Sequence, residues 1–307
     1  MNNPSIDITL LTEKRYLRPI PGNPYLENIF LEDQLLTRAL ESRGLKVHRT
    51  RWDDPEMDWS ETKFAVFRTT WDYFDRFAEF DRWLTETAAL TQFLNPLELI
   101  RWNAEKHYLK DLQQKGIPIP PTYFILRGSS GSLAEHVQKM PWDELILKPV
   151  VSGTARHTYR FERGQSETLE AVFKELVAEE DMMLQAFQRS ILTEGEVTFV
   201  VFGGKFSHAV RKVAKPGDFR VQDDFGGTIH AFEPTGEQIA FAELAVGCCP
   251  QVPVYARVDA MWHEDGSLMV SELEIIEPEL WMRFHPPSAE VFADAIGQGM
   301  NRLESGK

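Results

Sequence analysis

The sequence lacks the features that mark several common classes of protein. Its two cysteines stand side by side at Cys248 and Cys249, so no disulfide framework and no CxxC zinc site is expected. No HExxH or HxH pair occurs, which argues against zinc chemistry. The motifs GxSxG, GxGxxG and GxxxxGK[ST] are also missing, which lowers the expectation of a serine hydrolase, a Rossmann dehydrogenase or a P-loop NTPase.

Positive charge is scarce as well. The chain has 33 Lys and Arg against 47 Asp and Glu, a formal net charge of −14. This balance argues against a general nucleic-acid or anionic-membrane surface, because both partners are polyanions, but it permits a local basic pocket for a nucleotide. No apolar run reaches transmembrane length and the N-terminus lacks a basic start, so we expect a cytoplasmic protein without a membrane partner. The sequence is compatible with a homodimer but contains nothing that decides the oligomeric state.

Strand-like and helix-like segments alternate over the first hundred residues. A buried-strand run starts at Ile6, an amphipathic helix is expected over residues 29–44, and further strands and a second helix follow. Such alternation predicts a largely parallel sheet covered by helices. An Asn-Pro turn near residue 95 marks a boundary, so residues 1–98 are expected to form an α/β substrate domain.

From Tyr123 onward the pattern becomes strand-rich, with a few helices between the strands. This arrangement predicts an α+β region after the α/β domain. We divide it into a central unit, residues 99–186, and a C-terminal unit, residues 187–307. Thr235 and Gln238 match a capping box, which predicts the start of a helix there.

Residues 255–281 contain two strand-like runs around an Asp-Gly pair, with carboxylates inside the apolar runs. Asp-Gly is the preferred centre of a two-residue type I′ hairpin turn. In that register Asp259 lies opposite Glu272, and Arg257 lies opposite Glu274, with all four side chains on one face. The other face is a packing surface formed by Ala256, Val258, Ala260, Trp262, Met269, Ser271, Leu273 and Ile275.

The three acids Asp259, Glu272 and Glu274 need compensation, because like charges opposite each other destabilise a sheet. A divalent cation suits them, and oxygen ligands alone indicate Mg²⁺ or Mn²⁺ rather than zinc. The alternative is a solvated outer sheet face on which Arg257 merely pairs with a neighbouring acid. A loop of three or five residues would also change the face assignment.

Lysine and arginine residues at strand ends supply candidate anion sites. Lys148 ends an apolar strand and precedes a loop of small residues, where it can reach phosphate oxygens; a solvent-exposed lysine is the alternative. Arg68 and Asp72 follow another buried strand, at the edge where open α/β sheets bind ligands. Arg68 can form a forked contact with a carboxylate or phosphate, although capping and packing explain the segment equally well.

A second hairpin is expected to turn at Gly203 and Gly204. This turn places Arg211 across from Glu196, and a cross-strand salt bridge is the simplest interpretation of the pair. Residues 215–227 then form a polar, glycine-containing loop. Its composition is typical of a mobile cover over a site, and also of an ordinary surface loop.

The order of these segments resembles that of the ATP-grasp superfamily, particularly the glutathione-synthetase-like and ribosomal-protein glutamate ligases. The resemblance covers roughly residues 95–281. Seven segments appear in the family's order: NPLELIRWNAEKHYLKDLQQKGIPIPPT, LILKPVVSG, MLQAF, EGEVTFVVFGGKFSHAVRK, DFRVQDDFGG, RVDAMW and SELEIIEP. RTTWDYF and the downstream RWNAEKHYL are similar to the D-cycloserine-synthetase-like branch.

The resemblance implies an ATP-grasp fold whose two subdomains clamp the nucleotide. It also implies an ATP-dependent carboxylate–amine ligase that forms an amide through an acyl phosphate, acting on a small amino-acid-like or peptide substrate. The alternatives are a non-catalytic ATP-binding regulatory module and an ATP-grasp kinase that stops at a phosphorylated product.

The resemblance further implies roles for individual residues. Contacts with ATP are implied for Lys106, Lys148, Ser152, Gly153, Gln185, Ala186, Phe187, Glu194 and Glu196. The implied ligands of Mg²⁺ or Mn²⁺ are Asp259, Glu272 and Glu274. The residues implied to act on the phosphoryl group are Arg211 and Arg220, and those implied to contact the carboxylate and amine substrates are Arg68, Asp72 and Arg257.

The chain departs from the family pattern at four positions. Glu274 stands where many relatives have Asn as the third metal ligand, and Thr198 stands where close relatives often have Arg. Ala155 and Arg156 replace glycines of the phosphate loop. We therefore expect an additional negative charge at the metal site, which Arg257 can compensate, and a phosphate loop of different flexibility.

Overall fold

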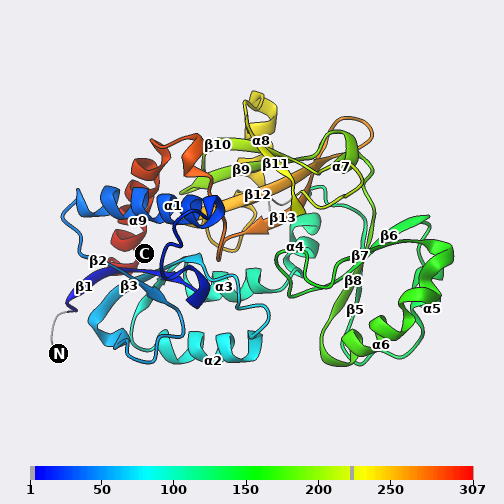
Figure 1. The fold of residues 1–307 in the computed structure, drawn as a ribbon, viewed down its shortest axis with the longest axis horizontal. Coiled ribbons are helices and arrows are strands. Elements are labelled where there is room, and N and C mark those ends of the chain that lie inside the picture. Colours follow the sequence, from blue (N-terminus) through cyan, green and yellow to red (C-terminus); the bar gives the residue numbers. More distant parts are fainter. Residues whose placement is uncertain (1–3, 222–224, 307) are drawn as a thin grey trace.

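The computed structural model describes residues 4–221 and 225–306. Three sheets organise this part of the chain (Figure 1). The first is parallel, in the order β2 (Val47–Arg51), β1 (Ile6–Thr12), β3 (Thr62–Thr69) and β4 (Gln92–Leu94). Helices lie on both of its faces: α1 (Pro24–Glu41) and α9 (Ser288–Glu304) on one, α2 (Phe77–Thr87) and α3 (Leu97–Ala104) on the other.

Alternation along the strands separates the two apolar layers of this sheet. Leu10 packs with Phe292 of α9, whereas the next residue, Leu11, packs with Phe80 of α2. A strand that is buried on both faces is expected to be mostly apolar, and in β1 the buried polar residues Thr9 and Thr12 form hydrogen bonds with threonines of β3. The C-terminal helix α9 thus completes the N-terminal domain, although the two lie at opposite ends of the sequence.

The second sheet is antiparallel and has one face covered by two short helices. Its order is β5 (Thr122–Ile125), β8 (Met182–Ala186), β6 (Glu144–Pro149) and β7 (Tyr159–Glu162). The covering helices are α5 (Leu133–Gln138) and α6 (Glu170–Glu179). Ser132 and Glu135 form a capping box at the start of α5, which satisfies amide groups that the first helical turn leaves unpaired.

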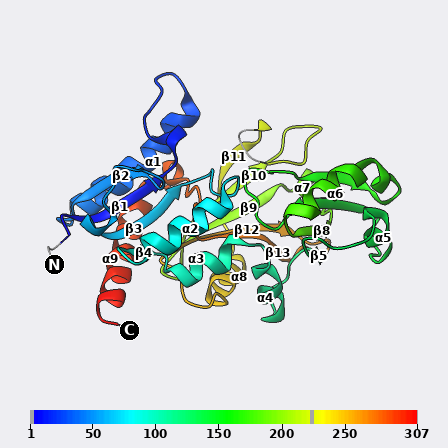
Figure 2. The ribbon, with the colours of Figure 1, turned by 90° about the horizontal axis from the view of Figure 1, so that it is seen from below.

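The third sheet is antiparallel and lies between the other two (Figure 2). Its order is β11 (Thr228–Phe232), β10 (Lys205–Val213), β9 (Glu196–Phe202), β12 (Tyr255–Trp262) and β13 (Leu268–Glu274). One face packs against α4 (Tyr108–Gln114) and α8 (Gly236–Gly247). As predicted, α8 begins at a capping box of Thr235 and Gln238.

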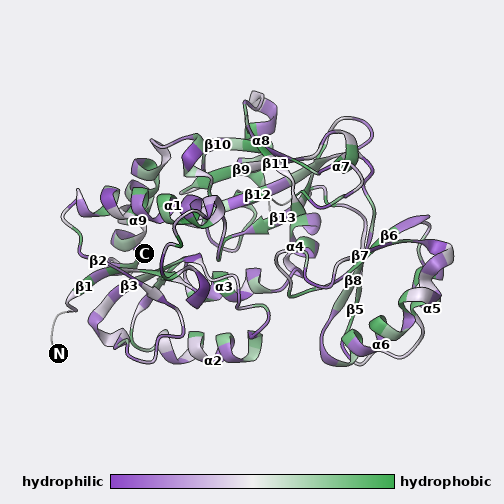
Figure 3. Ribbon diagram, viewed as in Figure 1, coloured by the Kyte–Doolittle hydropathy of each residue, from purple (hydrophilic) through white to green (hydrophobic). Residues whose placement is uncertain are grey.

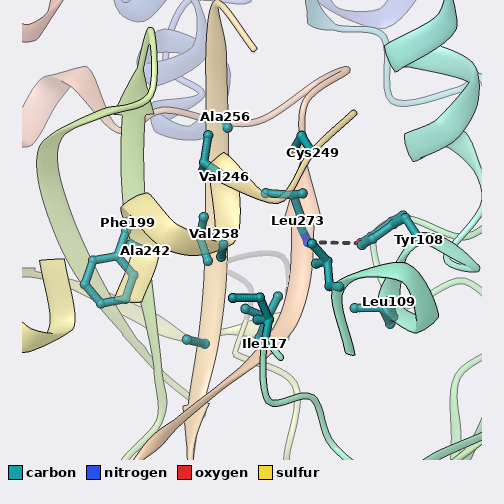
Figure 4. Packing of buried hydrophobic residues seen from close by; sticks show 14 of the residues in the cluster. Tyr108, Leu109, Ile117, Phe199, Ala242, Val246, Cys249, Ala256, Val258 and Leu273 are labelled. Carbon is teal, nitrogen blue, oxygen red and sulfur yellow. Dashed lines mark hydrogen bonds between the residues drawn. The ribbon is translucent and has the colours of Figure 1, made fainter. Parts of the chain in front are cut away.

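Figure 4 shows the packing on that covered face, where Val258 of β12 and Leu273 of β13 meet Val246 of α8 and Leu109 of α4. The Leu273 amide donates a 2.9 Å hydrogen bond to the Tyr108 hydroxyl. Hydrophobic and hydrophilic residues alternate along α2 and α9, which cover the first sheet, as expected for amphipathic helices (Figure 3). One face of the third sheet is therefore closed; on the other face Val200 and Phe202 pack against α9, and the polar side chains lie on the remaining part.

The predicted order of an α/β region followed by an α+β region is confirmed. Among the described residues, no helix is long and apolar enough to cross a membrane.

Candidate active site

A pocket of about 200 Å³ receives side chains from all three parts of the chain. Its polar and charged lining includes Lys106, Lys148, Ser152, Gln185, Glu196, Lys212, Arg220, Arg257, Asp259, Ser271, Glu272, Glu274, Glu277 and Glu279. Its aromatic lining is formed by Tyr25, Trp71, Phe74, Phe187, Phe219 and Trp281. Concave sites that combine an apolar wall with a few converging polar groups are the usual sites of small ligands.

The β12–β13 hairpin confirms the predicted pairs but not the predicted turn. Arg257 pairs with Glu274, and Asp259 pairs with Glu272. The turn, however, has three residues rather than two: the His263 amide donates to the Ser267 carbonyl at 2.8 Å, and the Gly266 amide donates to the His263 carbonyl at 2.9 Å. Gly266 has a φ of +84°, as the last position of a three-residue hairpin loop requires.

A β-bulge compensates for the longer turn. The register shifts by one residue between Asp259 and Ala260, because Ser271 is an extra residue in β13. Ser271 consequently joins Glu272 in lining the pocket. The predicted packing face is wrong at two positions, because Leu268 and Val270 pack into the core where Met269 and Ser271 were expected.

Asp259 lies at the centre of a buried ionic network. It accepts hydrogen bonds from Arg257 (2.8 and 3.1 Å), Lys212 (2.9 Å) and Thr198 (2.6 Å). Burial favours the protonated acid, but the charges of Arg257 and Lys212 outweigh it and hold the pKa of Asp259 well below its ordinary value. Thr198, at a position where the family resemblance implies Arg, therefore contributes to holding this carboxylate.

The other two predicted metal ligands are also paired with cations. Glu272 Oε1 lies 2.9 Å from Lys106 Nζ, and Glu274 accepts a hydrogen bond from Arg257. Burial raises the pKa of Glu274 well above its ordinary value; Arg257 opposes this shift, and the nearby Glu272 and Asp259 add to it. Within the described residues, no group of three His, Cys, Asp or Glu is arranged to hold a metal ion. Side-chain cations neutralise the three acids in this arrangement.

In the β9–β10 hairpin the predicted turn is confirmed, but the predicted pair is wrong. Gly203 and Gly204 have φ values of 56° and 82°, as a two-residue type I′ turn requires. The register then shifts by one residue between Phe206 and His208, so Lys212, not Arg211, lies opposite Glu196. A bulge of one residue exchanges the faces of all following side chains.

This shift brings Lys212 into the pocket and keeps Arg211 out of it. Lys212 Nζ lies 2.5 Å from Glu196 Oε2, and the Lys212 side chain is only 3% exposed. Arg211 instead donates to the Glu194 carbonyl, with its guanidinium 5.7 Å from the Trp262 ring. In the described chain neither Arg211 nor Glu194 lines the pocket.

Two further lysines face the same pocket from the other side. Lys148, on β6, makes no ion pair within the described residues; burial lowers its pKa to about 8. Lys106 donates to the Ser152 carbonyl and pairs with Glu272. Both lysines retain N–H groups that can bind phosphate oxygens.

The loop of residues 151–158 forms part of the pocket wall. Thr154, Ala155 and His157 have left-handed backbone conformations, with φ between 47° and 56°. Arg156 holds the loop by two 2.9 Å hydrogen bonds to Glu180. Ion pairing thus fixes this loop at a position where the family resemblance implies glycine.

The loop also contacts the N-terminal domain closely. Arg156 Nε lies 3.1 Å from Asp75, and a Cβ atom on Gly153 would lie 2.4 Å from the Phe74 ring. Glycine is therefore required at residue 153 for steric reasons.

Gln185, Ala186 and Phe187, which the resemblance implies as the hinge that meets adenine, line the pocket at the end of β8. The Ala186 amide donates to the Pro121 carbonyl at 2.9 Å, and the Phe187 amide donates to the Glu144 carbonyl of β6 at 3.0 Å. Phe219 of the predicted cover loop packs 5.9 Å from the Phe187 ring. Arg220, also in the pocket lining, pairs with Asp218 at 2.7 Å. Residues 222–224 of that loop lie outside the described residues.

Arg68 and Asp72 do not line the pocket of the described chain, so their expected substrate contacts are not supported. Arg68 is 1% exposed and is paired with Glu32. Asp72 accepts hydrogen bonds from Trp52 (2.7 Å) and Arg76 (2.9 Å). The same segment supplies other pocket residues, because Trp71 and Phe74 do line it.

The pocket contains several residues that the sequence did not single out: Tyr25, Trp71, Phe74, Lys212, Ser271, Glu277, Glu279 and Trp281. Lys212 and Ser271 depend on bulges, which have no clear signature in these strands. A signal did exist for the last group, because Glu277, Glu279 and Trp281 directly follow the acidic strand β13.

Comparisons with known proteins show which proteins the chain is similar to. Residues 8–95 match the family model of the N-terminal domain of D-cycloserine synthetase DcsG. The cycloserine biosynthesis protein DcsG of Streptomyces lavendulae is 29% identical over 281 residues, which cover 86% of this chain and 92% of that protein. A crystal structure of D-cycloserine synthetase DcsG superposes with a TM-score of 0.82 and 27% identity, over 95% of this chain and 99% of that chain.

More distant structures share the fold. D-alanine–D-alanine ligase from Bacillus anthracis superposes with a TM-score of 0.67 at 16% identity, over 98% of this chain and 99% of that one. The ATP-grasp ligase PsnB, in complex with a minimal precursor, gives 0.63 at 17% identity, over 95% and 99%. The chain thus has an N-terminal domain similar to that of D-cycloserine synthetase DcsG, is similar to DcsG over most of its length, and shares its fold with ATP-grasp ligases.

Proposed function

We propose that the protein joins a small amino-acid-like carboxylate to an amine at the expense of ATP. A substrate carboxylate oxygen attacks the γ-phosphorus, which gives an acyl phosphate and ADP. The amine nitrogen then attacks the carbonyl carbon, the C–O bond to phosphate breaks, and the amine loses a proton as the amide forms. The observation that carries this proposal is the convergence of Lys106, Lys148 and Arg257 with three carboxylates in one pocket.

ATP would occupy the side of the pocket that the central unit forms. Lys106 and Lys148 would bind phosphate oxygens, and the loop of residues 151–158 would cover them. Adenine would lie against the hinge at Ala186 and Phe187. A closed cover over these phosphates would also keep water from the acyl phosphate. We also propose that the substrate domain ends at residue 98 and that the central unit, which binds ATP, ends at residue 186.

The donor set suits Mg²⁺ or Mn²⁺ in chemistry. Asp259, Glu272 and Glu274 offer oxygen atoms only, and they lie together on one sheet face. The raised pKa of Glu274 reflects burial together with crowding of negative charge, which a divalent cation would relieve. With the ion bound, Arg257 and Lys106 would give up some of their contacts with these carboxylates and bind phosphate oxygens instead. When bound, the ion would neutralise phosphate charge.

Arg257 and Lys212 are the cations best placed to act on the transferred phosphoryl group. Both touch Asp259, and both lie near the Trp281 ring, with the Arg257 guanidinium carbon at 5.0 Å and Lys212 Nζ at 5.5 Å. Fixed cations that face developing negative charge stabilise a transition state without reorganisation. Lys212 thus takes the role that the resemblance implies for Arg211. An intracellular location is part of the proposal, because ATP is a substrate.

The test is ADP release with Mg-ATP and a panel of amino acids, dipeptides and amines, followed by mass spectrometry of the product. Glu272→Gln should lower turnover by at least about 100-fold, because it removes one of the proposed ligands of the divalent cation. Glu264→Gln, on the exposed turn of the same hairpin, is the matched control and should retain full activity. Tight Mg-ATP binding without turnover on the panel would favour a binding module, and a phosphorylated end product would favour a kinase.

A further inference from the structure

The acids that line the pocket differ in how they are compensated. Five of the six are matched with cations: Glu196 with Lys212, Asp259 with Arg257 and Lys212, Glu272 with Lys106, Glu274 with Arg257, and Glu279 with Arg283. The sixth, Glu277, makes no ion pair with any described residue, although it is only 8% exposed. Burial raises the pKa of Glu277 to about 7, and the charge of Lys106, which is paired with Glu272, and the uncharged Tyr73 hydroxyl oppose this shift only in part. Buried carboxylates are normally paired, so a carboxylate that faces a pocket without an ion-pair partner of its own indicates a cationic ligand.

Glu277 is held in place by the N-terminal domain. The Trp71 indole N–H donates a 2.8 Å hydrogen bond to the Glu277 carbonyl. Three residues later, Glu32 accepts the Leu280 amide at 2.9 Å, and Arg68 donates to the Pro278 carbonyl at 3.4 Å. The buried Arg68–Glu32 pair therefore fixes the segment that presents Glu277. A site whose backbone is fixed in this way loses little entropy when a ligand binds.

Trp281, in the same segment, has an unused hydrogen-bond donor. Its side chain is 2% exposed, and its indole N–H has no partner in the described chain. Its backbone is left-handed, with φ at 45°, which is uncommon for a bulky residue. Strained backbone and an unpaired buried N–H are both enriched at ligand sites. An oxygen atom of a substrate would supply the missing acceptor.

The remaining wall on this side is aromatic. Trp71 packs edge to face with Tyr16 at 5.2 Å and lies 6.4 Å from Tyr25. Trp71 and Tyr25 both line the pocket. Aromatic faces attract ammonium groups and add to the attraction of a carboxylate.

We propose that Glu277 is the specificity-determining residue for a substrate with an ammonium group, and that the Trp281 indole N–H binds an oxygen of the same molecule. The substrate class is thus an amino acid or a close derivative, rather than a simple carboxylic or hydroxy acid. This inference rests on the proposed ligase function, since it assigns the substrate side of the same pocket.

Binding, rather than turnover, tests the inference. The probes are alanine and serine in both enantiomers, each matched with the hydroxy acid in which OH replaces the ammonium group, lactate or glycerate. Binding is measured by calorimetry with Mg²⁺ and a non-hydrolysable ATP analogue present. At least one ammonium compound should bind about 10-fold or more tighter than its hydroxy counterpart. Equal binding within every pair, or no binding by any ammonium compound, would overturn the inference.

Variants then locate the preference. Glu277→Gln should reduce the ammonium preference by about 10- to 100-fold, because it removes a buried charge partner, while Glu277→Asp should retain most of it. Trp281→Phe should weaken both members of each pair equally. If Glu277→Gln keeps the wild-type preference, Glu277 is not the determinant. Affinity of the wild-type protein for the ATP analogue is the independent readout. If the analogue does not bind, the proposed function is contradicted. If the analogue binds but the amino-acid probes behave otherwise than expected, only the inference about Glu277 fails.

Discussion

The two hairpins of the third sheet build the pocket by the same means but differ in how they deviate from regular geometry. The β12–β13 hairpin has a longer turn than its Asp-Gly pair suggests, and a bulge at Ser271 cancels the difference. The β9–β10 hairpin has the expected two-residue turn, and its bulge is not cancelled. The sequence therefore predicts the charged pairs of the β12–β13 hairpin correctly. In the β9–β10 hairpin it predicts Arg211 opposite Glu196, where the structure has Lys212.

The difference shows what a turn can and cannot determine. A turn fixes the pairing next to it, but each bulge shifts the pairing beyond it by one residue and reverses the faces. Both bulges lie between the turn and the charged residues. The bulge in β13 places a polar residue, Ser271, where an apolar residue would otherwise stand. The Ser271 hydroxyl donates a 2.6 Å hydrogen bond to Glu196 of the other hairpin. The bulges therefore bring the two hairpins into one site.

The largest expected effect separates Lys212 from Arg211. Lys212→Gln should lower turnover by about 100- to 1000-fold, because it removes a buried cation that faces the proposed phosphoryl group. Arg211→Gln should change turnover by less than about 3-fold, because its guanidinium contacts Glu194 outside the pocket. Steady-state ADP release measures both effects. Lys212 is also paired with two acids, so a thermal melt must show that the variant is folded.

The opposite result would favour the pairing predicted from the sequence, in which Arg211 lies opposite Glu196. If Arg211→Gln abolishes turnover while Lys212→Gln does not, the β9–β10 pairing described here does not hold in the working enzyme. Lys212→Arg provides a further control, since it keeps the charge at the same position and should recover part of the activity.

Sequence reasoning was sufficient where local signals and tertiary context agree. The alternation of strand and helix and the capping box at Thr235 are predicted correctly because each depends on residues close in sequence, whereas the pairing of Asp259 with Glu272 is correct only because the bulge at Ser271 cancels the longer turn. Arg68 was assigned to the substrate because its strand end is a common binding edge. Its partner Glu32, on α1, is far away in sequence, and no local pattern indicates that the pair is buried. Long-range ionic partners and single-residue bulges thus account for most of the errors.

A second prediction compares Lys212 with Lys148, two buried lysines in one pocket. The acids of the hairpins raise the pKa of Lys212 despite its burial, whereas burial lowers the pKa of Lys148 to about 8 from an ordinary value of 10.5. Affinity for the ATP analogue should therefore fall by about 10-fold as the pH rises from 7 to 9, because Lys148 loses its proton. Calorimetry across this range measures the fall.

Two controls assign the effect to Lys148. Lys148→Arg stays protonated, so its affinity should be independent of pH over the same range. Stability should change in the opposite sense: between about pH 8 and 10.5 the unfolded chain binds more protons at this lysine than the folded chain, so its contribution makes the protein more stable as the pH rises. A fall in affinity that persists unchanged in Lys148→Arg would assign the titration to another group.

The smallest expected effect concerns Ser271, the residue that links the two hairpins. Ser271→Ala removes the 2.6 Å hydrogen bond to Glu196 and leaves one oxygen of a buried carboxylate with fewer partners. The loss should lower the free energy of unfolding by about 1–2 kcal/mol and turnover by a few-fold. Ser267→Ala, on the exposed turn of the same hairpin, is the matched control for stability, because its hydroxyl bonds only to the exposed Asp265 among the described residues. Denaturant unfolding and ADP release measure the two effects. Equal stability of the two variants would mean that the bulge, and not the hydroxyl that it presents, holds the hairpins in register.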